Sequence, residues 1–359
     1  MSAVLVLADG TTLKGQAIGR PGTTVGEVVF TTSMTGYQEA VTDPSFAGQI
    51  LVFTYPLIGN YGTTDEDFES DRVHVEGVVI RELCPTPSNW RSKESLADFL
   101  LRNGVVGIAE VDTRALTRHL RVLGVMMGGI STDLNERDLL DLVRNTPNYG
   151  EVDFVTKVTS KAPHVVKGSA DGPAAGKRVS VLDLGLKRNI VRRLTALGCT
   201  AYIYPCHASA EQILEPNPHG VVLSPGPGNP ELLSYVMETA KKLIGKVPIM
   251  GICLGHQVLG TVLGGFTYKL KFGHRGSNHP VRELATGRVT ITTQNHGYAL
   301  SPEGLEKSGA VVSHVNCNDG TLEGFRHEDY RIITTQFHPE ASPGPRDSDG
   351  MFYEFVSMI

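Results

Sequence analysis

A cysteine between two glycines carries the strongest chemical signal in this chain of 359 residues. Cys253 follows an apolar run, Val247 to Ile252, and Gly251 and Gly255 lie two residues to either side. This spacing predicts a strand-turn-helix elbow with the cysteine at its tip, where the positive end of the following helix favours the thiolate. We interpret Cys253 as a nucleophile, the alternative being a buried structural cysteine. The other cysteines are interpreted as structural: Cys84, Cys199, Cys206 and Cys317.

A histidine and a glutamate near the end of the chain can serve such a nucleophile. His338 and Glu340 follow a β-rich run, residues 332–337. His338 can accept the thiol proton, and Glu340 can orient the imidazole and stabilise its charged form. Zinc deaminases also use His-x-Glu, but their Pro-Cys-x-x-Cys partner is absent from the sequence. Since neither Cys-x-x-Cys nor His-Glu-x-x-His occurs, no metal site is predicted.

A loop of alternating glycine and proline, residues 223–230, follows another apolar run. The backbone amides around Gly226 and Gly228 are accessible in such a loop. Together with the amide of Leu254, just after the nucleophile, they can stabilise an oxyanion. The alternative is an ordinary tight turn between a strand and a helix. The loop lacks the third glycine of a dinucleotide-binding fingerprint.

The second half of the chain alternates between strand and helix patterns. Strands are predicted at 179–184, 201–204, 221–223 and 247–252, and helices at 189–197, 210–214, 232–244 and 254–263. This alternation predicts an α/β fold with a doubly wound, mostly parallel sheet and helices on both faces. The three chemical segments lie at predicted strand ends, where open α/β sheets place their sites.

The first half of the chain predicts a different, mixed α/β domain. A hairpin is expected over 4–13, with further strands at 27–31 and 49–54. A helix is expected from its N-cap Asp112 to its C-cap Gly124. Its predicted core stripe is Leu116, Leu120 and Leu123, and the arginines of its other face are interpreted as solvated: Arg114, Arg118 and Arg121.

Composition suggests where the domains divide and excludes some classes of function. Residues 161–177 are rich in Gly, Ala, Pro and Ser, which predicts a linker between a domain at 1–160 and one at 178–359. No apolar run approaches the ~20 residues of a membrane span, and no secretion signal is recognised. An odd number of unpatterned cysteines favours the reducing cytoplasm. A net charge of -5 argues against nucleic acid as a partner.

These features resemble the class I glutamine amidotransferases, whose Gly-x-Cys-x-Gly-x-Gln and His-Pro-Glu signatures match residues 251–257 and 338–340. Residues 31–46 and 54–62 further resemble the small subunit of carbamoyl-phosphate synthase, and the resemblance covers essentially the whole chain. Amidotransferases for anthranilate, GMP or CTP synthesis carry the elbow without this N-terminal domain. The resemblance implies a glutaminase that delivers ammonia through a tunnel to a large subunit. That partner makes carbamoyl phosphate from bicarbonate, ammonia and ATP for arginine and pyrimidine biosynthesis.

The resemblance also assigns residues. It implies that Cys253 is the nucleophile, His338 the base and Glu340 its orienter. The family often has Phe at position 298 and Gly at 337, where this chain has Tyr and Phe. Lys187 matches a position of the family's substrate site. The positions that match the family's glutamine-binding residues are Ser45, Gly226, Gly228, Leu254, Gln257, Asn295, Gly297 and Tyr298.

The partners and cofactors follow from the same resemblance. It implies L-glutamine as substrate, a large subunit as partner, and heterodimers that can assemble into a higher oligomer. No cofactor is expected in this chain, because the large subunit uses ATP and Mg. Residues 271–280 are predicted to be a loop that lines either the subunit contact or an ordinary surface. The alternatives left open are a free-standing glutaminase or γ-glutamyl hydrolase, and a catalytically silent regulatory subunit, against which the retained triad argues.

Overall fold

The computed structural model describes all 359 residues, which separate into two compact units. The N-terminal unit comprises Met1–Val152 and Lys271–Gly276, and the C-terminal unit comprises Asp153–Leu270 and Ser277–Ile359. None of the helices combines the length and the apolar character needed to cross a membrane.

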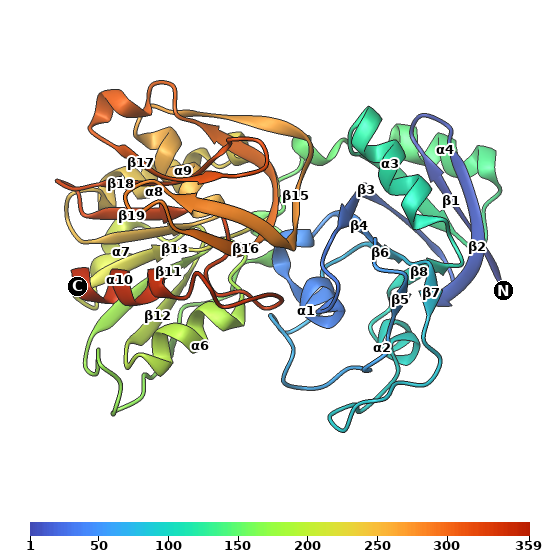
Figure 1. Cartoon of the computed structure of the whole chain (residues 1–359), viewed down its shortest axis with the longest axis horizontal. Coiled ribbons are helices and arrows are strands. Elements are labelled where there is room, and N and C mark those ends of the chain that lie inside the picture. Colours follow the sequence, from blue (N-terminus) through green and yellow to red (C-terminus); the bar gives the residue numbers. More distant parts are fainter. The chain divides into compact units, whose positions relative to one another are not determined.

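A closed β-barrel with strand order β1-β2-β8-β6-β4-β3-β9 forms the centre of the N-terminal unit (Figure 1). Within it β3, β4, β6 and β8 lie side by side and run parallel, whereas β1, β2 and β9 make antiparallel pairs. The strands are β1 (Ser2–Leu7), β2 (Thr12–Gly19), β3 (Thr23–Thr31), β4 (Gln49–Phe53), β6 (Gly77–Val79), β8 (Val106–Ala109) and β9 (Met126–Ser131), with a separate short pair β5 (Leu57–Ile58) and β7 (Glu82–Leu83). The helices are α1 (Tyr37–Thr42), η1 (Pro44–Phe46), α2 (Leu96–Arg102), α3 (Thr113–Leu123), α4 (Glu136–Asn145) and η2 (Tyr149–Glu151).

Alternation along the strands fills both sides of the barrel wall. In β3, Val28 and Phe30 belong to the interior cluster, whereas Val29 joins the cluster under α1 and α2. Leu116 and Leu120 of α3 pack into the interior cluster. Helix α3 therefore covers one end of the barrel.

The predicted helix boundaries at α3 are confirmed. Asp112 accepts a hydrogen bond from the backbone N–H of Ala115 at 2.9 Å, and Gly124 follows the last turn with φ 100°. The predicted core stripe is wrong at Leu123, which is 58% exposed. Leu123 lies at the helix end, where the chain has already turned away from the barrel.

A 10-stranded sheet with strand order β10-β12-β11-β13-β14-β19-β18-β17-β15-β16 forms the C-terminal unit. The strands from β12 to β19 in this order are parallel, and β10 and β18 pair antiparallel at the flanks of this parallel region. The strands are β10 (His164–Val166), β11 (Arg178–Asp183), β12 (Thr200–Pro205), β13 (Gly220–Leu223), β14 (Ile249–Ile252), β15 (Phe266–Glu283), β16 (Val289–Ser301), β17 (Val311–Asn316), β18 (Leu322–His327) and β19 (Ile332–Thr335).

Helices cover both faces of this sheet (Figure 1). Apolar residues of α7, α8 and α9 share one core cluster, whereas those of α6 and α10 share the other. The predicted doubly wound α/β fold is thus confirmed. The helices are α5 (Val155–Val158), α6 (Arg188–Ala196), α7 (Ala210–Leu214), η3 (Pro230–Leu232), α8 (Ser234–Leu243), α9 (Leu254–Val262), η4 (Leu305–Ser308) and α10 (Gly350–Met358).

Two segments differ from their predicted structure. Residues 161–177 count with the C-terminal unit instead of linking the two, because β10 pairs with β12 and Ala174 is buried in the core. Residues 271–280 are not a loop but part of β15. Of these, Lys271–Gly276 belong to the N-terminal unit, where Phe272 stacks on Phe30. Residues 271–280 of this strand are mostly polar and lack the apolar run by which strands were recognised.

The turn between β14 and α9 shows why glycine is needed on both sides of Cys253. A Cβ on Gly251 would lie 2.7 Å from Leu259 Cδ1, and a Cβ on Gly255 would lie 2.2 Å from the carbonyl oxygen of Leu223. The helix can begin directly after the strand only because these two positions have no side chain.

We predict that Gly255→Ala destabilises the C-terminal unit by about 1–3 kcal/mol, because the added methyl group must displace the β13 backbone. Gly350→Ala is the matched control. A Cβ there has nothing within 4 Å, and alanine in a helix should be neutral or stabilise by up to ~1 kcal/mol. Urea denaturation followed by circular dichroism measures both. Equal stability of the two variants would contradict the steric explanation.

Candidate active site

The predicted nucleophile lies at a strained backbone position. Cys253 joins β14 to α9 with φ 52° and ψ -102°, a conformation that residues with a side chain rarely adopt. Its N–H donates to the carbonyl oxygen of Thr335 in the neighbouring strand at 2.7 Å. The residue is only 2% exposed. The sulfur is thus fixed at the end of the central parallel strands, as expected for an elbow, but it is buried, whereas the pattern predicts an exposed side chain at the tip.

The predicted base and orienter lie just beyond β19. His338 Nδ1 and Glu340 Oε1 are 2.6 Å apart, and both residues are buried. The His338 backbone N–H donates to Thr293 O at 2.9 Å, which fixes this segment against β16. Nε2 of His338 is buried and makes no hydrogen bond of normal geometry. That nitrogen is the one left for proton exchange with the sulfur.

A buried lysine completes the arrangement. Lys187 Nζ lies 3.2 Å from Glu340 Oε1 and donates to the carbonyl oxygen of Ala341 at 2.6 Å. Asn189 donates through Nδ2 to the carbonyl oxygen of Glu340. The sequence suggested only that Lys187 matches a substrate-site position. The structure instead places its ammonium group against the orienting carboxylate.

The electrostatics of this row set the protonation states. Burial alone would raise the pKa of Glu340, but the charges of Lys187 and His338 outweigh it and lower that pKa to about 2. Burial alone would lower the pKa of His338, but the charges of Glu340 and Cys253 outweigh it and raise that pKa to about 10. The imidazole is therefore held in its charged form at neutral pH.

Gln336 is a further site residue that the sequence reasoning missed. Its Nε2 lies 3.6 Å from the sulfur of Cys253, and its Oε1 accepts from Gln257 Nε2 at 3.0 Å. A signal was present in the sequence. Gln336 lies two residues before His338, directly after the end of β19.

Several of the predicted glutamine-binding residues of the C-terminal unit surround Cys253. Cys253 Sγ lies 3.6 Å from Asn295 O, and Gln257 Nε2 donates to Tyr298 O at 2.8 Å. A Cβ on Gly226 would lie 2.8 Å from Leu254 Cδ2, so the glycine-proline loop packs on the first turn of α9. Leu254 is the first residue of that helix, where backbone N–H groups have no intrahelical acceptor. An oxyanion can use this amide.

The remaining predicted binding positions have less direct geometry. Gly228 lies in the same loop as Gly226 with φ 97°, and Gly297 lies in β16 beside Tyr298. Ser45 belongs to the N-terminal unit, where its N–H donates to Asp43 Oδ1 at 2.9 Å. Its buried Oγ has no hydrogen-bond partner. A part for Ser45 in glutamine binding stays a prediction.

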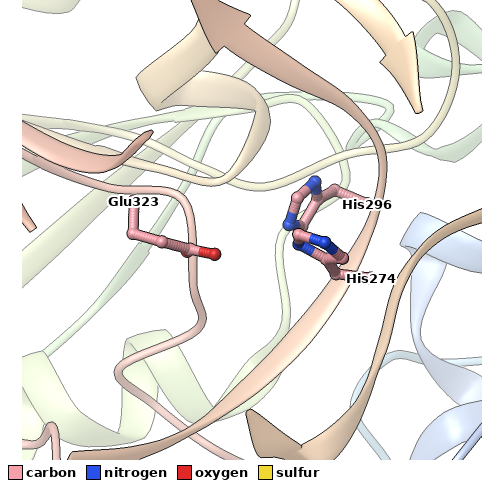
Figure 2. A group of neighbouring side chains, drawn as sticks. All are labelled: His274, His296 and Glu323. Atoms are coloured by element: carbon pink, nitrogen blue, oxygen red, sulfur yellow. The ribbon is translucent and has the colours of Figure 1, made fainter. Parts of the chain in front are cut away.

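A polar network connects β16 with β18. Figure 2 shows His296 and Glu323 directed toward one another, and Gln294 joins them. Gln294 Oε1 lies 3.0 Å from His296 Nε2, and Gln294 Nε2 donates to Glu323 Oε2 at 2.8 Å. His296 Nδ1 lies 2.7 Å from Tyr298 O. These contacts hold the backbone of Asn295–Tyr298 in place and give His296 a structural part in the site.

Phe337 and the cysteines other than Cys253 differ in how far they are exposed. Phe337 is buried and meets the ring of His314 edge-on, with centroids 5.5 Å apart. Cys199 and Cys206 are buried as expected of structural cysteines. The structural interpretation is wrong for Cys317, which is exposed, and incomplete for Cys84, which is half-buried.

Two family models match this chain, and several curated proteins are similar to it over its whole length. Residues 180–358 match the family model of class-I glutamine amidotransferases, and residues 5–130 match that of the carbamoyl-phosphate synthase small chain, CPSase domain. Over the whole chain it is 48% identical to the carbamoyl phosphate synthase small chain of Syntrophotalea carbinolica, covering 98% of that protein. It is 49% identical to the protein of that name from Nostoc sp., with 95% of the latter covered. The chloroplastic small chain of Oryza sativa is 45% identical over 99% of this chain and 82% of its own length.

The C-terminal unit therefore defines a class I glutamine amidotransferase. The chain as a whole belongs to the carbamoyl phosphate synthase small chain family.

The charged row predicts how stability depends on pH. His338 has a folded-state pKa of about 10 against an ordinary 6.5, so its contribution is complete below pH 6.5 and is lost as the pH rises through about 10. We expect the stability difference between wild type and His338→Asn to shrink over this range. The exposed His164→Asn is the control and should show no such trend. Urea denaturation at a series of pH values measures both, and a constant difference for His338→Asn would contradict the charged row.

Proposed function

We propose that this chain is the glutaminase subunit of a carbamoyl-phosphate synthase. The observation that carries the proposal is the buried row Lys187, Glu340 and His338 beside Cys253 on its strained elbow. Membership of the small chain family supports the choice among amidotransferases. The free-standing glutaminase and the silent regulatory subunit are not favoured, because the family match covers both units and the nucleophile, base and orienter are all present.

In this proposal the sulfur of Cys253 attacks the side-chain amide carbon of L-glutamine. The C–S bond forms as the carbonyl π bond opens, and the oxyanion accepts a hydrogen bond from the Leu254 amide, with the loop at Gly226 packed beside it. His338 then gives its Nε2 proton to the amide nitrogen as the C–N bond breaks. Ammonia leaves, and a thioester to Cys253 remains.

Water completes the cycle. His338, now neutral, takes a proton from water as the oxygen attacks the thioester carbon, and glutamate leaves as the thiolate returns. Glu340 keeps the imidazole oriented and stabilises its charged form, and Lys187 offsets the charge of Glu340. Gln257, Asn295, Gly297, Tyr298 and Gly228 hold the substrate's amino-acid end, and a part for Ser45 stays a prediction.

The ammonia is proposed to pass to a large subunit that makes carbamoyl phosphate from bicarbonate and ATP. That partner would use ATP and Mg, and this chain would need no cofactor of its own. Heterodimers could assemble further. A reducing compartment such as the cytoplasm suits the five free cysteines, including the nucleophile.

We predict that Cys253→Ser lowers glutamine hydrolysis on the order of a thousandfold or more, because a hydroxyl is a much weaker nucleophile than a thiolate. With the large subunit present, carbamoyl phosphate synthesis from added ammonium should be kept. Cys317→Ser, at an exposed cysteine, is the matched control and should leave both rates unchanged. Substantial glutamine hydrolysis by Cys253→Ser would remove Cys253 from the mechanism.

The partner itself gives a second test. The isolated chain should hydrolyse glutamine slowly, and the large subunit with bicarbonate and ATP should accelerate it roughly tenfold or more, as for coupled sites. Glutamate release with and without these components measures the effect, and gel filtration measures complex formation. Fast hydrolysis by the chain alone, with no complex formed, would favour the free-standing glutaminase.

A further inference from the structure

A cavity of about 790 Å³ lies within the N-terminal unit, and four arginines line it. Arg114, Arg118 and Arg121 come from one face of α3, and Arg81 comes from the segment after β6. None of these four guanidinium groups makes an ion pair, although the chain carries more acidic than basic residues. The arginines predicted to be a solvated helix face therefore surround a hollow.

The cavity lies where the parallel strands of the barrel end. Thr32 follows β3 directly, Thr54 follows β4 directly, and Arg81 lies two residues after β6. Asp112 lies three residues after β8 and caps α3. All four line the cavity. In sheets with parallel strands this carboxyl edge is where ligands bind, since loops and helix N-termini converge there.

The lining favours an anion. Four arginines against the single carboxylate of Asp112 leave three net positive charges, and the N-terminus of the eleven-residue α3 adds a positive partial charge. Thr117 also lines the cavity, and its buried Oγ1 has no hydrogen-bond partner. The four arginines are exposed, so their positive charge attracts an anion from solution, and salt screens this attraction.

We propose that this cavity is a binding site for a small ligand that carries phosphate groups. Guanidinium groups bind phosphate oxygens in pairs. The donors come from several strand ends and one helix, so they approach from different directions. This suits a tetrahedral phosphate group better than a planar carboxylate, which presents two oxygens in one plane. The volume falls within the ~300–1,000 Å³ of small-molecule sites and exceeds that of a single phosphate.

Calorimetric titration of the full chain with pyrophosphate, at fixed ionic strength, tests the site. We expect one saturable site that is weakened at least tenfold in Arg118→Gln and in Arg114→Gln. Arg118→Lys keeps the positive charge but loses the paired N–H donors of the guanidinium group, so it should bind with intermediate affinity. Arg20→Gln removes the same charge from an exposed position of the same unit outside the cavity and should bind like wild type. Citrate, a carboxylate probe whose net charge near pH 7 is similar to that of pyrophosphate, should bind more weakly than pyrophosphate.

Other outcomes would overturn the proposal. One is the absence of saturable pyrophosphate binding. Another is an equal loss of pyrophosphate affinity in Arg118→Gln and in Arg20→Gln. Weakened assembly of Arg118→Gln with the large subunit, in the absence of pyrophosphate binding, would instead make the arginines a contact for acidic groups of that protein. Circular dichroism and urea denaturation of the isolated variants serve as the folding control. Because binding is read by heat, the result does not depend on the proposed glutaminase function.

Discussion

The active site depends on the stability of a buried, alternating row of charges. Lys187, Glu340 and His338 are each no more than 1% exposed, so none of them can rely on water for solvation. Glu340 is the partner of both cations, so removing it leaves two buried positive charges unpaired, and breaking a buried pair in this way typically costs about 3–5 kcal/mol. The charged imidazole of His338 is therefore sustained by the carboxylate of Glu340 in the same row.

The parallel strands explain how residues so distant in sequence form one row. Lys187 follows β11, Cys253 follows β14 and His338 follows β19, and these strands lie in one sheet with the same direction. Their carboxyl ends therefore meet at one edge. The barrel of the N-terminal unit uses the same geometry at its own parallel strands, where Arg81 and the arginines of α3 gather. Strand direction thus decides the location of both the candidate active site and the arginine-lined cavity.

Strain at the nucleophile is offset by the packing around it. The positive φ of Cys253 costs on the order of 1–3 kcal/mol, and glycines on both sides let β14 and α9 meet without a clash. The hydrogen bond from Cys253 to Thr335 ties the strained residue to the next strand. A fixed sulfur has little conformational entropy to lose on attack, which is the advantage of such a turn.

Features that depend on residues close together in the chain could be predicted from the sequence. The glycines around Cys253, the spacing of His338 and Glu340 and the alternation of strands and helices each constrain neighbouring residues, so they predicted the elbow, the pair and the doubly wound sheet. Contacts between distant segments can be seen only in the folded chain: Lys187 pairs with Glu340, and His164–Val166 join the sheet from within residues 161–177. The same holds for the arginines of α3, because a periodic pattern shows which face of a helix is polar but not what lies opposite it.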